Sequence, residues 1–444
     1  MAYLRFNVTE HQKILAIALP MIVSNITVPL LGLVDTAVMG HLDSEDYLAG
    51  VAVGAMITSF IFWLMGFLRM ATTGLIAQAH GAKNWQHIER HCQQSIIIIV
   101  VLTILFLLLH QTIKVFALSM AGASESVTYY AGQYFDVRIW SFPAVAFNLV
   151  IMGVLLGLQN AKGPMILLIV TNLLNMLLDV VFVFGFNWDV KGVAAASLIA
   201  DYVGLGFGLY LVRKVLLAAG YAIPRFNIKQ AMQQNYSRFM SLNRDILIRS
   251  LCLQICFVFM TFAGARMGDN IVAANAILLN FLMLISFGLD GFAYAAEALV
   301  GKAYGERNTA LIKHNVKLTL IWSVLLSALF SVFFAVFGVY IIRLMTDLPH
   351  IITTANAYFA WIIGLPLVAV WCFLFDGVFI GLTRAKDMRN SMIVSMLLGF
   401  FAVWWLSQSW GNHGLWLAMT SFMLMRGVTL AWRYRMLINN KLVE

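Results

Sequence analysis

Charged residues are scarce in this chain of 444 residues, because Asp, Glu, Lys and Arg together make up only 11% of it. Ordinary soluble domains carry about 25% charged residues, so this composition excludes a typical soluble protein. Strand-length segments that alternate apolar and polar residues are also lacking, which argues against a membrane β-barrel. The first apolar run lacks a small-residue cleavage site and continues into a full-length span, so we interpret it as a transmembrane helix and not as a signal peptide.

Cysteine is also scarce. Its four positions, Cys92, Cys252, Cys256 and Cys372, lie in or at the ends of apolar runs. Cys252 and Cys256 share a helix face, but no His or further Cys joins them at the spacing of metal ligands. We therefore expect the cysteines to be small buried side chains. The sequence predicts no resident metal and no cofactor.

What the chain has in abundance is apolar sequence, with 61% hydrophobic residues and a mean hydropathy of +0.86. Its apolar blocks are long enough to cross about 30 Å of hydrocarbon as helices. They predict an all-α integral membrane protein with twelve transmembrane helices. Lys and Arg concentrate in alternate loops, such as "HGAKNWQHIERH" and "TRAKDMRN". By the positive-inside rule these loops and both termini are cytoplasmic, at the cell inner membrane, and the formal charge of +9 reflects topology and not nucleic-acid binding.

An internal repeat organises the chain. The segment "GLIAQAHGAKNWQHIERH" (residues 74–91) aligns without gaps to "ALVGKAYGERNTALIKHN" (residues 298–315), a shift of 224 positions. The same shift pairs Gly157 with Gly381. With six spans in each half, both halves begin on the cytoplasmic side and are parallel repeats. Secondary transporters of this build bind solute between their halves and expose it to each side in turn.

The repeat also predicts the domain boundaries. We expect an N-terminal six-helix lobe over residues 1–218, a cytoplasmic linker over 219–238 and a C-terminal six-helix lobe over 239–444. The linker coincides with the longest charged segment between spans, which follows the sixth span.

Polar residues inside the N-terminal spans are the candidate functional residues. Asp35 has no other charge from position 14 to position 40, and it lies a few residues before the external end of the first span. Asp179 lies at a similar depth on the fifth span, where Asn172 and Asn175 precede it by seven and four residues on the same helix face. The sixth span adds Asp201, deeper in the membrane. Acids inside a membrane are costly, and by default they indicate function.

Such acids can carry a proton from one side to the other, and their oxygens also suit Na⁺. The alternative is that they satisfy neighbouring helices and only fix packing. The repeat favours a functional role, because the positions that correspond to Asp35 and Asp179 are Phe259 and Val403. If the acids served only to build the fold, the second half would be expected to need them as well. We therefore assign ion coupling to the N-terminal half.

The composition also indicates the solute. Twenty-three methionines and a 13% share of aromatic residues suit a cavity that repacks around varied bulky ligands. An acid in such a cavity favours amphipathic cations, partly through cation–π contacts. Residues expected to line it are Asn148, Met152, Asn172 and Met176. The expected partners are small amphipathic molecules and membrane lipids, and the protein is expected to act as a monomer.

Three stretches resemble one transporter family: "AQAHGAKN", its echo "GKAYGERN", and "LVDTAVMGHL" in the first span. They are similar to the multidrug and toxic compound extrusion (MATE) transporters, within the DinF-like branch, and the resemblance covers nearly the whole chain. It implies a two-lobe cation-coupled antiporter that exports drugs and contributes to antibiotic resistance, and it favours H⁺ as the coupling ion, with Na⁺ as the alternative. It also implies a cation site at Asp35, Asn175 and Asp179, and a bend of the first helix at Pro20. From the residues alone, Pro29 is a rival hinge.

The chain departs from the NorM-like branch of the same family. That branch uses a glutamate on the seventh helix with an aspartate on the tenth. Asp376 is present on the tenth, but the seventh helix carries only Asp245 near its mouth and Gln254 midway. We do not expect a second cation site of that type, and the roles of Asp376 and of Asp290 on the eighth helix stay open.

Two other classes of function, a lipid flippase and a membrane enzyme, fit the sequence less well. A flippase for lipids or lipid-linked sugars needs a basic cleft, but only Arg69 and Arg138 lie inside the N-terminal spans. We expect Arg138 to be a structural partner of a neighbouring helix. An integral membrane enzyme needs a nucleophile, an acid–base pair or a metal set. His80, His87 and His91 cluster in one loop, but the matching loop has no such cluster, so we do not expect an enzyme.

Overall fold

The computed structural model describes residues 8–39, 45–224 and 226–440. Within its helices, the side chains at positions 8, 30, 33, 35–37, 39 and 45 lie outside the described part. The described residues are almost entirely helical and include no strand. Twelve stretches among them are long and apolar enough to cross a membrane, so the all-α fold with twelve spans is confirmed.

In chain order the elements are α1 (Val8–Met39), α2 (Glu45–Leu64), α3 (Gly66–Gly81), α4 (Trp85–Ala121), α5 (Glu125–Arg138), η1 (Ile139–Ser141), α6 (Phe142–Gly157), α7 (Lys162–Val180), η2 (Val181–Gly185), α8 (Asp189–Ala218), α9 (Ile228–Met232), α10 (Ser237–Arg266), α11 (Asp269–Gly305), α12 (Thr309–Met345), α13 (Pro349–Gly381), α14 (Ala385–Val394), η3 (Ser395–Ala402), α15 (Val403–Ser407), η4 (Gln408–Trp410) and α16 (Asn412–Asn439). The segments η2 and η3 are π-helical. Four spans are composite: α2 with α3, α5 to α6, α7 with η2, and α14 to η4.

The repeated loop motif has the same local structure in both halves. Lys83 and Arg307, which are repeat equivalents, both adopt positive φ (51° and 55°) just after a helix end. The next residue then caps the following helix, because Asn84 Oδ1 accepts from His87 N (3.1 Å) and Asn308 Oδ1 accepts from Leu311 N (2.9 Å). Asparagine suits this position because its side chain satisfies one of the free N–H groups of the first turn. The sequence motif is therefore a helix stop followed by a helix start.

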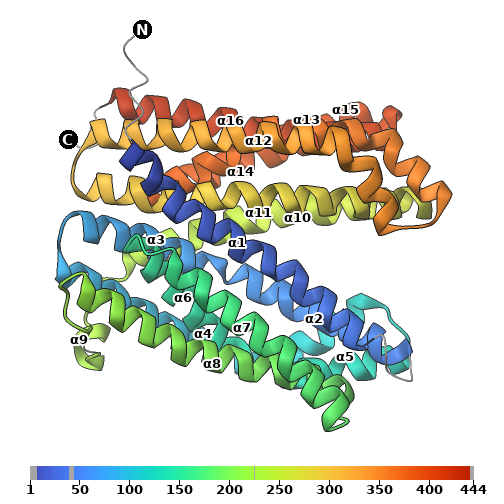
Figure 1. Ribbon diagram of the computed structural model, residues 1–444, viewed down its shortest axis with the longest axis horizontal. Coiled ribbons are helices and arrows are strands. Elements are labelled where there is room, and N and C mark those ends of the chain that lie inside the picture. The colour runs from blue at the N-terminus through green and yellow to red at the C-terminus, as the bar shows by residue number, and fades with distance from the viewer. Residues whose placement is uncertain (1–7, 40–44, 225, 441–444) are drawn as a thin grey trace. The chain divides into compact units, whose positions relative to one another are not determined.

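A pair of glycines in each half brings two helices into close contact. "GVLLG" (residues 153–157) ends α6 and "GVFIG" (residues 377–381) ends α13, again at a shift of 224. A Cβ on Gly153 would lie 2.8 Å from the carbonyl oxygen of Arg69 on α3, and a Cβ on Gly377 would overlap the carbonyl oxygen of Ala293 on α11. Small residues four apart let membrane helices approach at the backbone. In Figure 1, α11, α12 and α13 run side by side.

Contacts divide the chain into two compact units. The N-terminal unit is Val23–Phe239, and the C-terminal unit combines Met240–Glu444 with the residues up to Ile22. This grouping differs from the division predicted from the sequence, which placed residues 1–22 in the first lobe. The reason is local packing: α11 has no side chain at Gly291, where a Cβ would overlap Ile22 and lie 2.9 Å from the carbonyl oxygen of Ala18. One continuous helix, α1, thus contributes to both units.

Candidate functional site

Helix α7 of the N-terminal unit has a polar face that is buried. Asn172, Asn175 and Asp179 are 8%, 4% and 0% exposed, whereas Leu173 and Leu177 are both 61% exposed. This is the reverse of a helix on a soluble protein, and it is the pattern expected where the outer surface meets lipid and the polar groups serve the interior. The carboxylate of Asp179 is therefore held inside the N-terminal unit.

The two amides of this face connect α7 to its neighbours. Asn172 Nδ2 donates to Thr27 Oγ1 on α1 (2.8 Å), and Asn175 Nδ2 donates to Ser197 Oγ on α8 (2.7 Å). The amide oxygen of Asn175, Oδ1, is buried and accepts no hydrogen bond from the described residues. Asp179 follows one turn later, two residues before the π-helical segment η2, and single π-helical turns are often found at functional sites.

Asp35 lies on α1, and its side chain is outside the described part of the structure. The residues on either side show which level of the N-terminal unit this part of α1 occupies. Val34 and Val38 pack in a cluster with Val183, which is four residues beyond Asp179. The backbone at Asp35 therefore lies near the end of α7 that carries Asp179.

The spacing of residues along α1 and α7 also places Asp35 and Asp179 at the same depth. Asn172 bonds Thr27, and from that contact α1 and α7 run in the same direction, because they form the first and fifth of alternating spans. Asp35 is eight residues beyond Thr27 and Asp179 is seven beyond Asn172, which is about 12 Å and about 10 Å of helix at 1.5 Å per residue. The two acids thus lie at matched depth on neighbouring helices.

Asp201 is held by a cation of the protein itself. Its Oδ2 accepts from Arg138 Nη1 at 2.5 Å, and both side chains are 15% exposed. The guanidinium of Arg138 also lies over the ring of Phe62, with its central carbon 4.9 Å from the centroid. Because Arg138 already neutralises Asp201, this carboxylate is poorly suited to hold a further cation. The ion pair connects the end of α5 to α8.

The residues expected to line a solute cavity all lie in the N-terminal unit, on α6 and α7. Asn148 Nδ2 donates to the carbonyl oxygen of Asp201 (3.0 Å), while its buried Oδ1 has no partner among the residues described. Met152 packs against Ile151, Leu155 and Leu167. Met176 is half-buried on the turn between Asn175 and Asp179, and Asn172 is the partner of Thr27. The structure gathers these residues on two adjacent helices.

Pro20 and Pro29 both lie inside α1, which continues through them. Proline lacks an N–H, so Pro20 deprives the carbonyl of Ala16 of its helical hydrogen bond. The division between the units falls after Ile22, two residues beyond Pro20, whereas Pro29 lies within the N-terminal unit. Of the two prolines, Pro20 is the one at the point where α1 passes between units.

The C-terminal unit contains a buried charge cluster that sequence reasoning missed. Asp376 Oδ2 on α13 accepts from Arg249 Nη2 on α10 and from Arg426 Nη2 on α16, the latter at 2.7 Å. Asp376, Arg249 and Arg426 are 6%, 7% and 1% exposed. The carboxylate of Asp376 thus forms ion pairs with two guanidiniums. The signal that could have revealed them was available, because each arginine is a lone cation inside an apolar stretch, "DILIRSLCL" and "SFMLMRGVTL".

The histidines of the loop between the second and third spans are not arranged as a metal site. His80 Nδ1 lies 3.0 Å from the hydroxyl of Tyr221, and His91 Nδ1 lies 3.0 Å from Gln94 Oε1. Over residues 8–39, 45–224 and 226–440, no group of three or more His, Cys, Asp or Glu side chains is placed to hold a metal ion. The four cysteines are free and buried, as expected.

Comparison with known proteins identifies the family. A family model described as MatE matches residues 20–181 and 246–405, once in each half. The chain is 48% identical over 431 residues to DNA damage-inducible protein F of Escherichia coli (strain K12), covering 96% of this chain and 93% of that protein. It is 26% identical over 324 residues to a probable multidrug resistance protein NorM of Acinetobacter baylyi, covering 70% of each chain.

The fold is similar to solved structures across the same range. A crystal structure of MATE in the bent conformation matches with a TM-score of 0.85, covering 97% of this chain and 96% of that one at 19% identity. An outward-facing structure of a multidrug resistance MATE family transporter matches with the same TM-score at 20% identity. The chain is therefore a multi-pass membrane protein that belongs to the MATE family of multidrug efflux transporters, in the DinF-like branch, and it is not an enzyme.

Proposed function

We propose that this protein is a proton-coupled antiporter that exports amphipathic, often cationic, compounds by alternating access. The proposal places it in the cell inner membrane with both termini cytoplasmic, acting as a monomer without a cofactor. The Lys- and Arg-rich loops support this orientation. Relatives named as multidrug resistance proteins support the class of substrate.

The observation that carries the proposal is the buried carboxylate of Asp179 on the polar face of α7. The Asn172–Thr27 hydrogen bond and the packing of Val38 with Val183 fix how far α1 is shifted along α7. The positions of Asp35 and Asp179 are therefore at similar depth in the membrane. Two carboxylates that are poorly hydrated and close in depth repel each other, and a proton or a small cation relieves that repulsion. Asn175, whose amide nitrogen donates to Ser197, supplies an amide oxygen one helical turn before Asp179.

In this mechanism, α1 bends or straightens according to whether a proton is bound to Asp35 or Asp179. When a proton binds, the acids no longer repel, and the half of α1 beyond Pro20 can approach α7. That movement contracts the cavity lined by Asn148, Met152, Asn172 and Met176 and releases the solute. Pro20 absorbs the change because the helix lacks one hydrogen bond there. Asp201 has a separate role, which is to keep Arg138 in place between α5 and α8.

Transport assays in proteoliposomes test the proposal with separately imposed gradients. A fluorescent amphipathic cation should be exported under a proton gradient, but not under a sodium gradient alone. Asp35→Asn and Asp179→Asn should each reduce proton-driven efflux to background. Asp136→Asn is the matched control, because Asp136 is an exposed acid of the same unit that pairs with Lys114 at the surface (2.8 Å). If Asp35→Asn leaves proton-driven efflux intact, the mechanism is wrong.

A flippase is less well supported. It requires a basic cleft for phosphate groups, and three of the arginines inside the spans are already paired with aspartates. Arg138 pairs with Asp201, and Arg249 and Arg426 both pair with Asp376. Translocation of a labelled lipid headgroup by the purified protein, without efflux of the fluorescent cation, would favour the flippase instead.

A further inference from the structure

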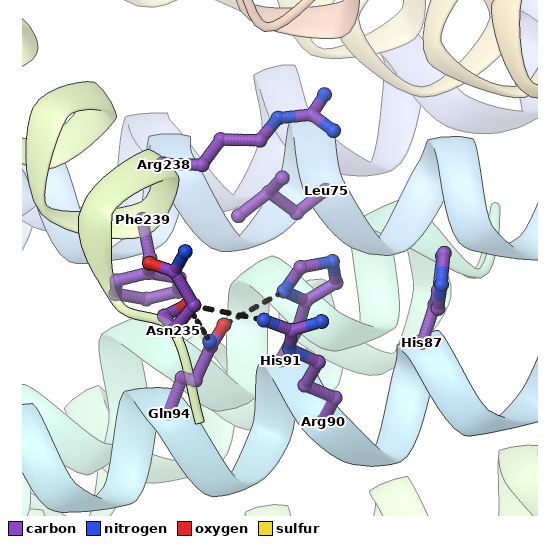
Figure 2. A pocket seen from close by; sticks show the side chains of 8 residues that line it. All are labelled: Leu75, His87, Arg90, His91, Gln94, Asn235, Arg238 and Phe239. Atoms are coloured by element: carbon purple, nitrogen blue, oxygen red, sulfur yellow. Dashed lines mark hydrogen bonds between the residues drawn. The ribbon is translucent and has the colours of Figure 1, made fainter. Parts of the chain in front are cut away.

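A small cavity lies in the N-terminal unit, where the start of α4 meets the segment that leads into α10 (Figure 2). Its volume is about 100 Å³, and it is lined by Leu75, His87, Arg90, His91, Gln94, Asn235, Arg238 and Phe239. The efflux mechanism uses none of these residues.

Hydrogen bonds from α4 form one wall of the cavity. Arg90 Nη2 and Gln94 Nε2 both donate to the carbonyl oxygen of Asn235, each at 3.1 Å. His91 Nδ1 lies 3.0 Å from Gln94 Oε1, which orients the amide for that bond. Figure 2 shows these side chains converging on Asn235 from α4, with Arg238 on the far side of Leu75. The cavity is therefore framed by fixed polar groups.

The lining is positively charged. Its charge comes from two arginines, and none of its eight residues is Asp or Glu. Arginine stays charged at any physiological pH and presents a planar set of donors that matches phosphate. The electrostatics of the cavity favour an anion with several oxygen acceptors.

Size separates this cavity from a drug site. Pockets for drug-sized ligands measure roughly 300–1,000 Å³, so a cavity of about 100 Å³ is too small for them. One water molecule occupies roughly 30 Å³ of liquid, so the cavity has room for a group a few times larger. A single tetrahedral phosphate meets this requirement.

The depth of the cavity suits a lipid headgroup. The continuous apolar run of α4 begins at Ile96, two residues after Gln94, which is about 3 Å along the helix. The cavity therefore borders the polar end of a span, in a loop rich in Lys and Arg, on the face that we propose to be cytoplasmic. Basic pockets between transmembrane helices on that side bind the headgroups of anionic lipids.

We propose that this cavity binds the phosphate group of an anionic phospholipid from the cytoplasmic leaflet. Arg90 and Arg238 supply the charge. Because Asn235 belongs to the segment between the two six-helix halves, the bound lipid fastens that segment to α4. Anionic lipid is thus a stabilising ligand of the N-terminal unit, separate from the transported solute.

Thermal melting of the full-length protein in lipid nanodiscs tests this site. Replacing part of the phosphatidylcholine with phosphatidylglycerol should raise the melting temperature of the unaltered protein. Arg90→Gln combined with Arg238→Gln should remove most of that increase. Arg238→Gln alone should reduce it, and because Arg238 is exposed this variant is expected to fold. Arg213→Gln removes one charge from an exposed position of the same unit outside the cavity and serves as the control.

Each outcome decides the question. A phosphatidylglycerol-dependent increase that Arg213→Gln retains and the cavity variants lose supports the proposal. Equal increases in all variants would overturn it, because the lipid would then act elsewhere. A third arm adds inorganic phosphate to nanodiscs of phosphatidylcholine alone. If inorganic phosphate reproduces the full increase, the ligand is a free oxyanion and the lipid proposal is wrong. Proton-driven efflux of the fluorescent cation is measured in parallel, and its loss or retention bears on the transport mechanism alone.

Discussion

The two halves of the chain place their buried charge at different points of one shared helix plan. In the N-terminal unit the buried acid is Asp179, and its repeat equivalent in the C-terminal unit is Val403. The C-terminal unit has three buried acids, Asp245, Glu297 and Asp376, and a shift of 224 positions makes the equivalent of Asp376 Met152. The amides beside Asp179 are neutral, whereas Asp376 contacts two guanidiniums. This difference supports the proposal that the N-terminal unit exchanges a cation, because the charge of Asp376 is already balanced by arginines of the protein itself.

The position equivalent to Asp35 makes the contrast sharper. Phe259 packs with its ring edge-on to Phe400, Phe401 and Trp404, with centroids 5.8, 5.1 and 6.2 Å away. Aromatic pairs of this kind are worth about 0.5–1.5 kcal/mol each beyond the area they bury. The fold therefore gains stability from an apolar cluster at the place where the other half has a costly acid. This contrast supports the proposal that the acids of the N-terminal unit serve transport.

The largest effect is expected at Asp376. Asp376→Asn removes the carboxylate that both Arg249 and Arg426 contact, and breaking a buried ion pair in this way costs about 3–5 kcal/mol. We expect a sharp drop in the melting temperature of the purified protein. Arg249→Met in the same protein removes one of the uncompensated cations and should restore part of the loss.

Asp179→Asn is the matched comparison for that prediction, because it neutralises a buried acid of the other unit. Its neighbours Asn172 and Asn175 are uncharged, and an amide has nearly the same shape, so its melting temperature should change much less. Equal losses of stability in Asp376→Asn and Asp179→Asn would contradict the division of roles between the two units.

The second effect concerns the glycines at the close helix contacts, Gly153 between α6 and α3 and Gly377 between α13 and α11, where the two halves are alike. Gly377→Ala should destabilise the C-terminal unit, because the added methyl overlaps the carbonyl oxygen of Ala293 and backbone cannot yield as a side chain does. Overpacking of this kind typically costs about 1–3 kcal/mol. Gly153→Ala should cost less, because its methyl lies 2.8 Å from the carbonyl oxygen of Arg69. Melting temperatures of the two variants, with the exposed Gly206→Ala as control, test this order.

Much of the fold was predictable because its signals are local or periodic. The length and composition of the spans gave the number of helices, and one shift of 224 positions identified the repeated loop and the pair Gly157 and Gly381. Asp179 was identifiable because a lone acid in an apolar run stands out. The sequence did not predict that the start of α1 groups with the C-terminal unit, since this depends on how residues up to Ile22 pack against α11.

The ion pairs were harder to predict because they join distant segments. Asp376 meets Arg249 and Arg426, which are 127 and 50 positions away along the chain. Arg138 was expected to be a structural partner of a neighbouring helix, but nothing in the sequence specified that its partner is Asp201, 63 positions away. Pairing across three helices depends on their rotation about their axes, and the spacing of residues within one helix does not determine that rotation.

A third and smaller effect tests the apolar side of the comparison. Phe259→Leu removes the edge-on ring contacts with Phe400 and Trp404 but keeps an apolar side chain, so we expect a loss of about 1 kcal/mol. Proton-driven efflux should stay at the level of the unaltered protein, in contrast to Asp35→Asn at the equivalent position. Loss of proton dependence in Phe259→Leu would show that the C-terminal unit also takes part in coupling.

The smallest effect is expected at Ser197, which positions a neighbour of the acid pair. Ser197→Ala removes the hydroxyl to which Asn175 Nδ2 donates at 2.7 Å, and hydrogen bonds between membrane helices average about 0.6 kcal/mol, so stability should hardly change. Without that bond the amide of Asn175 is free to turn, and its oxygen no longer has a fixed direction beside Asp179. We expect efflux that still responds to a proton gradient but needs a steeper one, measured as a shift in the pH dependence of transport. Ser197→Thr keeps the hydroxyl and should leave that dependence unchanged, whereas a shift of the same size in both variants would mean that Ser197 acts only by packing.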